Sequence, residues 1–265
     1  MKIFVFAYDR YQTMTTSEML EAEGIDHVVL CHNEEQKSSF IEGGRVLAKR
    51  LVVTNKPKGL SHNRGFALEL LENGEWGMFL VDDLVHIAEL DCYDEYRHVG
   101  RLSITPGETA IWKKRFDKRI NLKQFITRCE DDIRVAEKLG VYLIGFSSNE
   151  NPLFRNRKWI FRGLVDGRAW LVKRSKLLPD LNVHAVEDYC WTARNLMAFG
   201  SVMVNNWILV KCERYTAGGY GSKKQRLAQK LKECDYLVSR YGKYIAYANK
   251  PGEPARSHIK IKANG

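Results

Sequence analysis

Two adjacent acidic residues, Asp82 and Asp83, follow an apolar run at residues 76–81. The run has the length of a strand and the aromatic and branched side chains that suit a buried one. Two like charges at the end of a buried strand are unfavourable unless a positive group lies beside them. A divalent cation with a bound diphosphate would provide that charge, because Mg²⁺ and Mn²⁺ prefer oxygen ligands. The alternative is that the pair belongs to a surface turn or caps a helix.

A second acidic pair, Glu187 and Asp188, precedes a stretch with helical spacing that stops at Gly200. Acidic side chains in the first turn of a helix are stabilised by the helix dipole. Helix capping therefore explains this pair without any catalytic role.

A glycine-containing segment, residues 58–65, lies upstream of the first acidic pair. It predicts a turn at Gly59, a Ser or Asn N-cap, and an amphipathic helix with apolar residues at 67, 68, 70 and 71. Asn73 and Gly74 end this helix before the apolar run begins. The chain thus passes from a glycine loop through a basic helix start, a helix and a buried strand to an acidic pair.

The elements that position these residues alternate between strand and helix in the first third of the chain. The sequence predicts strands at residues 2–8, 26–31 and 51–54, and helices at residues 15–23 and 33–41. This alternation predicts an α/β fold in which helices cover both faces of a mostly parallel, Rossmann-like sheet. Ligands of such sheets bind beyond the carboxyl ends of the strands, where Tyr8, Arg10 and Asp82 fall.

The remaining two thirds of the chain are read from the same kinds of pattern. Helical spacing predicts helices at residues 122–139, 188–199 and 223–241, and the first of them follows Asn121 and ends at Gly140. Strands are predicted at residues 141–146 and 202–211, with a hairpin at 165–173 around Asp166 and Gly167. Residues 91–119 give no clear pattern, and the polar loop 147–157 is long enough to carry function.

Length and composition predict one globular unit. A chain of 265 residues, of which 45% are hydrophobic, suits a single domain over residues 1–265 or two closely packed halves. No apolar run reaches membrane-spanning length, and the N-terminus lacks a signal-peptide pattern. The six cysteines are scattered without zinc-type spacing. We therefore expect a cytoplasmic protein with reduced, mostly buried thiols and no membrane partner.

The charge balance favours a polyanionic partner. Lys and Arg number 42 against 32 Asp and Glu, which gives a net charge of +10. Cations gather at residues 113–119, 155–162 and 223–232, with aromatic residues among them at Trp112, Phe116, Phe154, Trp159, Phe161 and Tyr220. Cations neutralise phosphates and flat rings stack on exposed bases, so nucleic acid is the predicted partner. The alternative for each cluster is a solvated basic surface over core aromatics.

Four features in this order resemble the nucleotide-sugar glycosyltransferases of GT-A fold: the glycine loop from Gly59 to Arg64, the Asp82-Asp83 pair, the Glu187-Asp188 pair, and His258 near the C-terminus. The family's metal motif usually has an acid at each end of three residues, whereas Val81 stands at its first position here. Within the family, the chain is most similar to the TET-associated glycosyltransferases of bacteriophages. That resemblance implies transfer of a sugar to 5-hydroxymethylpyrimidines, such as hydroxymethylcytosine, in DNA.

The resemblance also implies where the sugar donor and its metal ion bind. A nucleoside-diphosphate sugar, such as a UDP-sugar, would bind across Tyr8, Arg10, Arg64 and Asp82. This donor site belongs to the half formed by residues 1–90. Asp83 and His258 would hold a Mn²⁺ or Mg²⁺ ion that neutralises the leaving diphosphate.

The acceptor would bind to the half formed by residues 91–265. In inverting members of the family the acid matching Asp188 takes a proton from the attacking acceptor hydroxyl. Glu187 would bind a hydroxyl of the acceptor or donor sugar, or cap the helix. An acceptor base in duplex DNA would have to flip out of the helix.

Other functions fit parts of the same sequence. A glycan or protein acceptor would use the same donor chemistry. A nucleotidyltransferase shares a similar core but needs a glycine-rich loop after the first strand, and residues 7–12 contain no glycine. A non-catalytic nucleic-acid-binding module would explain the basic clusters but neither acidic pair. The three-glycine segment at residues 214–222 is interpreted as an acceptor loop, with a plain linker as the alternative.

Overall fold

The computed structural model describes the chain except for residues 8, 99–108, 214–222, 250–251, 253 and 263–265, and it describes residues 92–98, 109–115 and 223–226 by their backbone only. Tyr8 and the three-glycine segment therefore lie outside the described residues. Among the residues that are described, no helix is long and apolar enough to cross a membrane. The five cysteines with described side chains are buried and free, as predicted.

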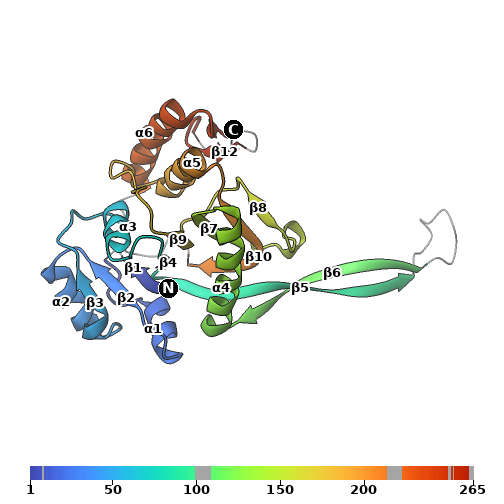
Figure 1. Ribbon diagram of the computed structural model, residues 1–265, viewed down its shortest axis with the longest axis horizontal. Helices are drawn as coiled ribbons and strands as arrows, with labels where there is room; N and C mark the ends of the chain where they lie inside the picture. Colours follow the sequence, from blue (N-terminus) through green and yellow to red (C-terminus); the bar gives the residue numbers. More distant parts are fainter. Residues whose placement is uncertain (8, 99–108, 214–222, 250–251, 253, 263–265) are drawn as a thin grey trace.

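A sheet of ten strands runs through both halves of the chain (Figure 1). Its strands, in spatial order, are β3 (Leu51–Val53), β2 (Val28–Cys31), β1 (Lys2–Phe6), β4 (Trp76–Val81), β9 (Ala169–Lys173), β7 (Leu143–Ser147), β10 (Met203–Cys212), β5 (Leu84–His98) and β6 (Thr109–Ile120), with β8 (Trp159–Phe161) paired to β10. The first four are mutually parallel. Beyond β4 only the β7–β10 pair is parallel, and the rest are antiparallel.

The predicted α/β class is confirmed, but the prediction of a mostly parallel sheet is wrong for the second half. Parallel neighbours need a long crossover connection, usually a helix. The chain instead passes from β4 through Asp82 and Asp83 directly into β5, which returns in the opposite sense beside β10. The result is a large mixed sheet.

Helices cover both faces of the sheet, as predicted. The side chains of β1 alternate between the faces: Ile3 and Val5 pack in one core, and Phe4 and Phe6 in the other. The first core contains residues of α1 (Thr15–Ala22), α2 (Glu34–Gly43) and α4 (Leu122–Leu139); the second contains residues of α3 (Leu60–Glu69) and α5 (Glu187–Phe199). Two short 3₁₀ helices lie at Ala48–Arg50 and Pro152–Phe154.

The C-terminal segment forms a third core outside α5. Helix α6 (Lys223–Tyr241) and a two-stranded sheet of β11 (Ile245–Tyr247) and β12 (Ile259–Ile261) pack against it. Its buried apolar residues include Val183 and Cys190 near the start of α5, and Leu237 of α6. The start of α5 is therefore held from both sides.

The predicted start and end of α4 are confirmed. Asn121 forms a capping box with Gln124 at the start of α4, and Gly140 ends that helix at φ 67°. The predicted Ser or Asn cap of α3 is wrong. The N-cap is Gly59 at φ 157°, without a side-chain hydrogen bond, and the Ser61 hydroxyl instead donates to the Val183 carbonyl.

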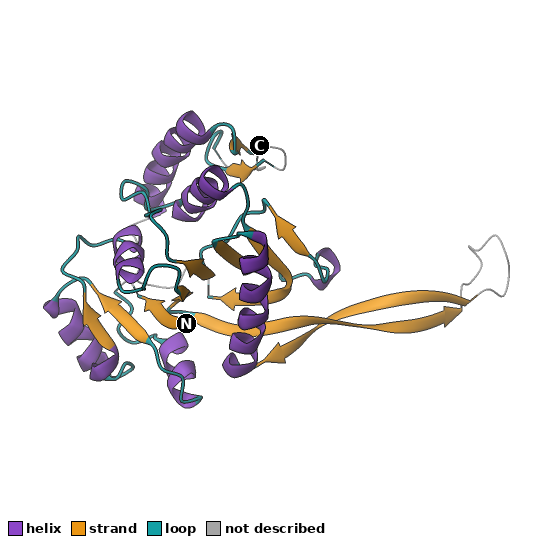
Figure 2. Cartoon of the chain, in the orientation of Figure 1, coloured by secondary structure: helices purple, strands orange, loops and turns teal. Residues whose placement is uncertain are grey.

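Two further segments differ from the sequence-based expectation. Asp166 and Gly167 do not form a hairpin, because the strand that follows them inserts between β4 and β7. The segment at 91–119, which has no clear pattern in sequence, contributes most of the β5–β6 ribbon. That ribbon is paired from Ile87–Ile120 to His98–Thr109 and extends away from the helices (Figure 2).

Candidate active site

A cleft of about 280 Å³ lies where β4 and β10 end, β9 begins and helices α3 and α5 start. Its lining contains both regions that carry acidic pairs in the sequence. The lining residues are Leu60, Val81, Asp83, Asp166, Gly167, Arg168, Glu187, Asp188, Cys212 and Glu213. The tertiary structure thus brings Asp83 within one cleft of Glu187 and Asp188, about a hundred residues later in the chain.

The backbone around the first acidic pair is fixed on both sides. The Thr16 amide donates to the Asp82 carbonyl over 3.2 Å, and the Glu213 amide donates to the Asp83 carbonyl over 3.0 Å. Strands β1 and β4 are parallel, with Phe6 paired to Val81. The loop after β1, which carries Arg10, consequently lies at the same edge of the sheet as the two aspartates.

Arg10 supplies the positive charge that the sequence requires beside Asp82 and Asp83. Its Nη1 lies 2.9 Å from Asp82 Oδ1 and 2.5 Å from Asp83 Oδ2. The aspartates are only 4% and 8% exposed. Burial raises the pKa of Asp83, although Arg10 acts in the opposite direction. Burial lowers the pKa of Arg10, but the two carboxylates outweigh this effect and the pKa of Arg10 is raised.

The Asp82-Asp83 pair fits a cation chemically, because both carboxylates offer oxygen ligands to one point and Arg10 Nη1 already lies there. A divalent ion would therefore require Arg10 to move. Within the described part of the chain, no group of three or more His, Cys, Asp or Glu side chains is arranged to hold a metal.

His258 does not line this cleft. It precedes β12 in the second sheet, where its carbonyl accepts a hydrogen bond from the Ala248 amide over 2.9 Å. Ligation of one metal ion by Asp83 and His258 together stays a prediction.

A second cavity, of about 540 Å³, lies beside the loop after β1. Arg10 lines this cavity while contacting Asp83, which lines the cleft, so Arg10 stands between the two spaces. The loop is held by Asp9 at φ 52°, which pairs with Lys58 and accepts hydrogen bonds from Tyr11 and Gln36.

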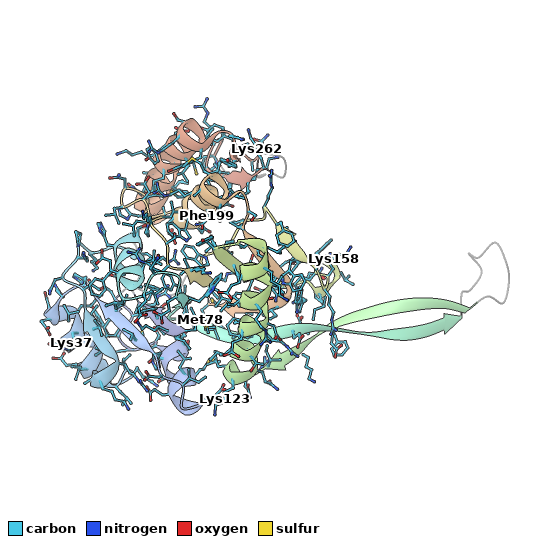
Figure 3. The ribbon with its side chains drawn as sticks, in the orientation of Figure 1. Lys37, Met78, Lys123, Lys158, Phe199 and Lys262 are labelled. Carbon is cyan, nitrogen blue, oxygen red and sulfur yellow. The ribbon has the colours of Figure 1, made fainter. Side chains whose placement is uncertain are left out.

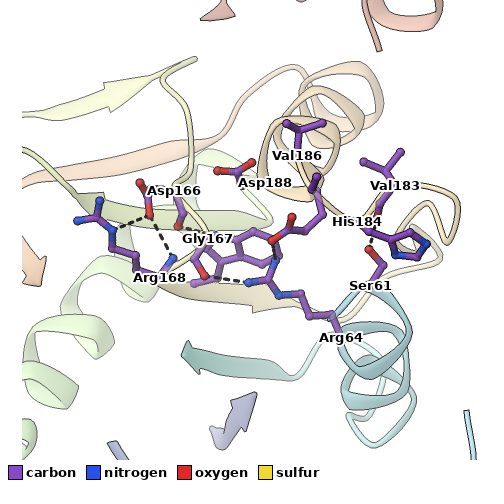
Figure 4. Close-up of polar contacts among 12 residues, drawn as sticks. Ser61, Arg64, Asp166, Gly167, Arg168, Val183, His184, Val186 and Asp188 are labelled. Atoms are coloured by element: carbon purple, nitrogen blue, oxygen red, sulfur yellow. Dashed lines mark hydrogen bonds and ion pairs between the residues drawn. The ribbon is translucent and has the colours of Figure 1, made fainter. Parts of the chain in front are cut away.

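Arg64 lies beneath the second acidic pair (Figure 4). Its Nη1 is 3.1 Å from Glu187 Oε1, its Nη2 donates to the Gly167 carbonyl over 2.8 Å, and its guanidinium lies 3.7 Å from the centre of the Trp170 ring. Arg64 is 2% exposed. These contacts position Glu187, and binding of the donor by Arg64 stays a prediction.

Asp188 has no such cation. Its Oδ1 accepts a hydrogen bond from the Tyr189 amide over 2.8 Å, and no ion pair to it is formed by the residues whose side chains are described. Burial, together with Glu187 and Asp166, raises the pKa of Asp188 well above its usual value. Burial also raises the pKa of Glu187, against the opposing effect of Arg64. A carboxylate with a raised pKa binds a proton more tightly, which suits a general base.

Glu187 and Asp188 both lie in the first turn of α5, where the helix dipole stabilises acids, but neither is its N-cap residue. The N-cap of α5 is Val186, which makes no side-chain capping bond. The amides of His184, Ala185 and Val186 instead donate to the buried carboxylate of Glu233 on α6, over 2.9, 2.7 and 3.2 Å. Glu233 thus fixes the turn from which Glu187 and Asp188 project.

Sequence reasoning missed two charged side chains of the cleft, Asp166 and Arg168. Arg168 Nε lies 3.2 Å from Asp166 Oδ1, and Arg168 Nη1 donates to the Val210 carbonyl on β10. The signal was present as an Asp-Gly-Arg triplet, but we interpreted it as a hairpin turn. Glu213, which follows β10, is also part of the lining.

A scan against models of known protein families finds no match for this chain, and a search of curated proteins finds no match either. The resemblance to GT-A glycosyltransferases therefore depends on sequence motifs, and the function must be inferred from the cleft.

Proposed function

We propose that the protein is a glycosyltransferase of GT-A type that moves a sugar from a nucleoside-diphosphate donor to a hydroxyl group, with hydroxymethylated DNA as the preferred acceptor. The observation that supports this most strongly is the shared cleft of Asp83 and Asp188. One acidic pair in it is matched by a cation, and the other contains an acid with a raised pKa.

The donor is assigned to the two spaces on either side of Arg10. The nucleoside fits the cavity beside residues 9–13, and the sugar fits the cleft with Asp83. Arg10 then faces the diphosphate that links them, where a guanidinium binds phosphate oxygens well. Asp82 and Asp83 hold Arg10 ready until the donor arrives.

Asp188 is assigned the role of base. It accepts the proton of the acceptor hydroxyl while the oxygen forms a bond to the anomeric carbon. The bond from that carbon to the diphosphate breaks, and the diphosphate leaves with the electron pair. Glu187, held by Arg64, orients a sugar hydroxyl beside it. A divalent ion bound at Asp83 would neutralise charge on the leaving diphosphate.

A radiolabelled transfer assay tests this proposal. The purified protein is incubated with UDP-sugars and Mn²⁺, together with plain DNA, hydroxymethylated DNA or a glycan acceptor. We expect label on hydroxymethylated DNA, and loss of that label in Asp188→Asn and Asp83→Ala. Asp131→Asn is the matched control, because Asp131 is a surface residue of α4 whose ion pair, among the described side chains, is with Arg134.

The products separate this function from its alternatives. Release of pyrophosphate from a nucleoside triphosphate would indicate a nucleotidyltransferase. DNA binding without turnover of any donor would indicate a binding module. Transfer unchanged in Asp188→Asn would overturn the role of Asp188.

A further inference from the structure

A surface on the other side of β10 exposes aromatic rings among cations. Phe154 is 71% exposed, Phe161 44% and Phe116 38%. The exposed cations Arg157, Lys158 and Arg162 lie in the same stretch of chain. We call these six residues the aromatic–basic surface. Large exposed apolar side chains rimmed by charge mark interaction sites in soluble proteins.

The surface is assembled from two of the basic clusters that are separate in sequence. Buried Arg155 pairs with Asp117 on β6, and Phe116 of β6 lies opposite Asp91 of β5, which pairs with Arg157. The Arg157 guanidinium donates to the Leu90 carbonyl on β5. Figure 3 places Lys158 on the side of the molecule from which the β5–β6 ribbon extends. These contacts fix residues 154–161 against the base of the ribbon.

The aromatic–basic surface includes strand β8, which is held by pairing with β10. All three residues of β8 are exposed, yet β8 pairs with β10 over Met203 to Asn205. The Trp159 indole donates to Asp132 over 2.9 Å and packs edge-on against Trp207. Rings that are exposed but held on a rigid strand lose little conformational freedom when a partner stacks on them.

Charge selects the kind of partner. The carboxylates contributed by the adjoining strands, Asp117 and Asp91, are each paired with an arginine. The cations of the surface, together with Lys118 and Arg119 on β6, outnumber these two carboxylates. A second copy of the chain would bring the same positive charge against itself, which is unfavourable. A polyanion with flat apolar groups is complementary.

Single-stranded nucleic acid has this chemistry, because its phosphates pair with cations and its unpaired bases stack on aromatic rings. Bases within a duplex are already stacked on each other. We propose that the aromatic–basic surface binds single-stranded nucleic acid outside the cleft. The role of this surface in docking the acceptor strand rests on the proposed function. Its binding of single-stranded nucleic acid does not.

The geometry sets the length of strand that would reach both places. Strand β10 starts at Met203, which pairs with Phe161, and ends at Cys212, which lines the cleft. Ten residues of extended chain span about 30 Å. At the ~3.4 Å per nucleotide of a helically stacked strand, about nine nucleotides cover this distance, and a more extended single strand needs fewer.

Fluorescence anisotropy tests the surface with labelled 15-nucleotide oligo-dT, oligo-U and a 15-base-pair duplex at fixed salt. We expect both single strands to bind more tightly than the duplex, and the double variant F154A/F161A to weaken their binding about 10-fold or more. The charge variant K158E/R162E should flatten the salt dependence of binding. A preference for oligo-dT or for oligo-U identifies DNA or RNA as the natural strand.

The matched control is Leu139→Ala, which removes an apolar side chain that is 54% exposed on α4, away from the surface. Because all these side chains are exposed, the variants should keep the wild-type melting temperature. Wild-type affinity in F154A/F161A, or equal affinity for the duplex, would overturn the proposal. So would a wild-type dimer that F154A/F161A converts to a monomer, which would assign the surface to self-association.

The two proposals fail in different ways. Asp188→Asn should bind oligo-dT like the wild type even though transfer is lost. If no donor is turned over by the wild type but oligo-dT still binds through Phe154 and Phe161, the surface stands and the transferase assignment falls. If transfer occurs but F154A/F161A leaves binding unchanged, the transferase assignment stands and the proposed surface falls.

Discussion

Each acidic pair of the cleft has one arginine beside it, but the two arginines contact different numbers of carboxylates. Arg10 reaches both members of the first pair, Asp82 and Asp83, whereas Arg64 reaches only one member of the second, Glu187. Asp188 is left beside like charges, and its pKa is raised well above the usual value. A pair whose two carboxylates converge on one guanidinium is suited to holding a cation between them. A pair with one unmatched acid is suited to taking up a proton.

This comparison predicts that substitution of Asp188 has the largest effect on catalysis. Asp188→Asn should lower kcat by about 10²- to 10⁴-fold, because general base catalysis contributes that much. Donor affinity, measured by calorimetry with UDP, should stay within about twofold. In the wild type the acid limb of the pH–rate profile should lie above the ordinary range of aspartate, since the base must be deprotonated. A loss of UDP affinity equal to the loss of rate would place Asp188 in donor binding instead.

The next largest effect tests the buried cation of the second pair. Arg64→Gln leaves Glu187 buried without its ion pair, and breaking such a pair costs about 3–5 kcal/mol of unfolding free energy. The double variant Arg64→Gln/Glu187→Gln should recover most of this loss. Urea denaturation measures both. A single variant as stable as the wild type would show that Arg64 does not compensate Glu187.

Asp132 provides a reference carboxylate that is buried without any cation. It is 1% exposed, and its only described partners are Asn205 and Trp159. Burial, against these two hydrogen bonds, raises its pKa to about 6. A raised acid pKa contributes stability below the unfolded value of 3.8 that is lost as the pH rises through 6. From pH 4 to pH 8 the wild type should lose up to about 3 kcal/mol relative to Asp132→Asn. Parallel stability curves would contradict this.

The smallest predicted effect concerns Arg10 and the Asp82-Asp83 pair. Arg10→Gln should raise the affinity of the protein for Mn²⁺ alone by about 10-fold, because the cation between Asp82 and Asp83 is removed. Adding Asp83→Asn should abolish the gain, and Arg64→Gln should not reproduce it. Electron paramagnetic resonance of free Mn²⁺ measures all three. Equal affinity in the wild type and Arg10→Gln would show that Arg10 does not compete with the ion.

The cleft was predictable only in its parts. The strand that ends at Asp82, the helix that starts near Asp188 and the Asn121 cap of α4 all depend on local patterns within a few residues. The choice of Arg10 and Arg64 as partners depends on contacts across 72 and 123 positions. No spacing rule reports such contacts, so the contact between Arg64 and Glu187 could not be predicted from the sequence.

The sequence by itself determined an α/β chain with acids at a strand end and a helix start, because hydrophobic periodicity and helix caps are properties of neighbouring residues. Only the tertiary structure decided that β9 enters between β4 and β7, that β5 leaves as a ribbon, and that Arg155 pairs with Asp117 on β6. Strand order and direction are set by burial and pairing between distant segments, and these exist only once the chain has folded.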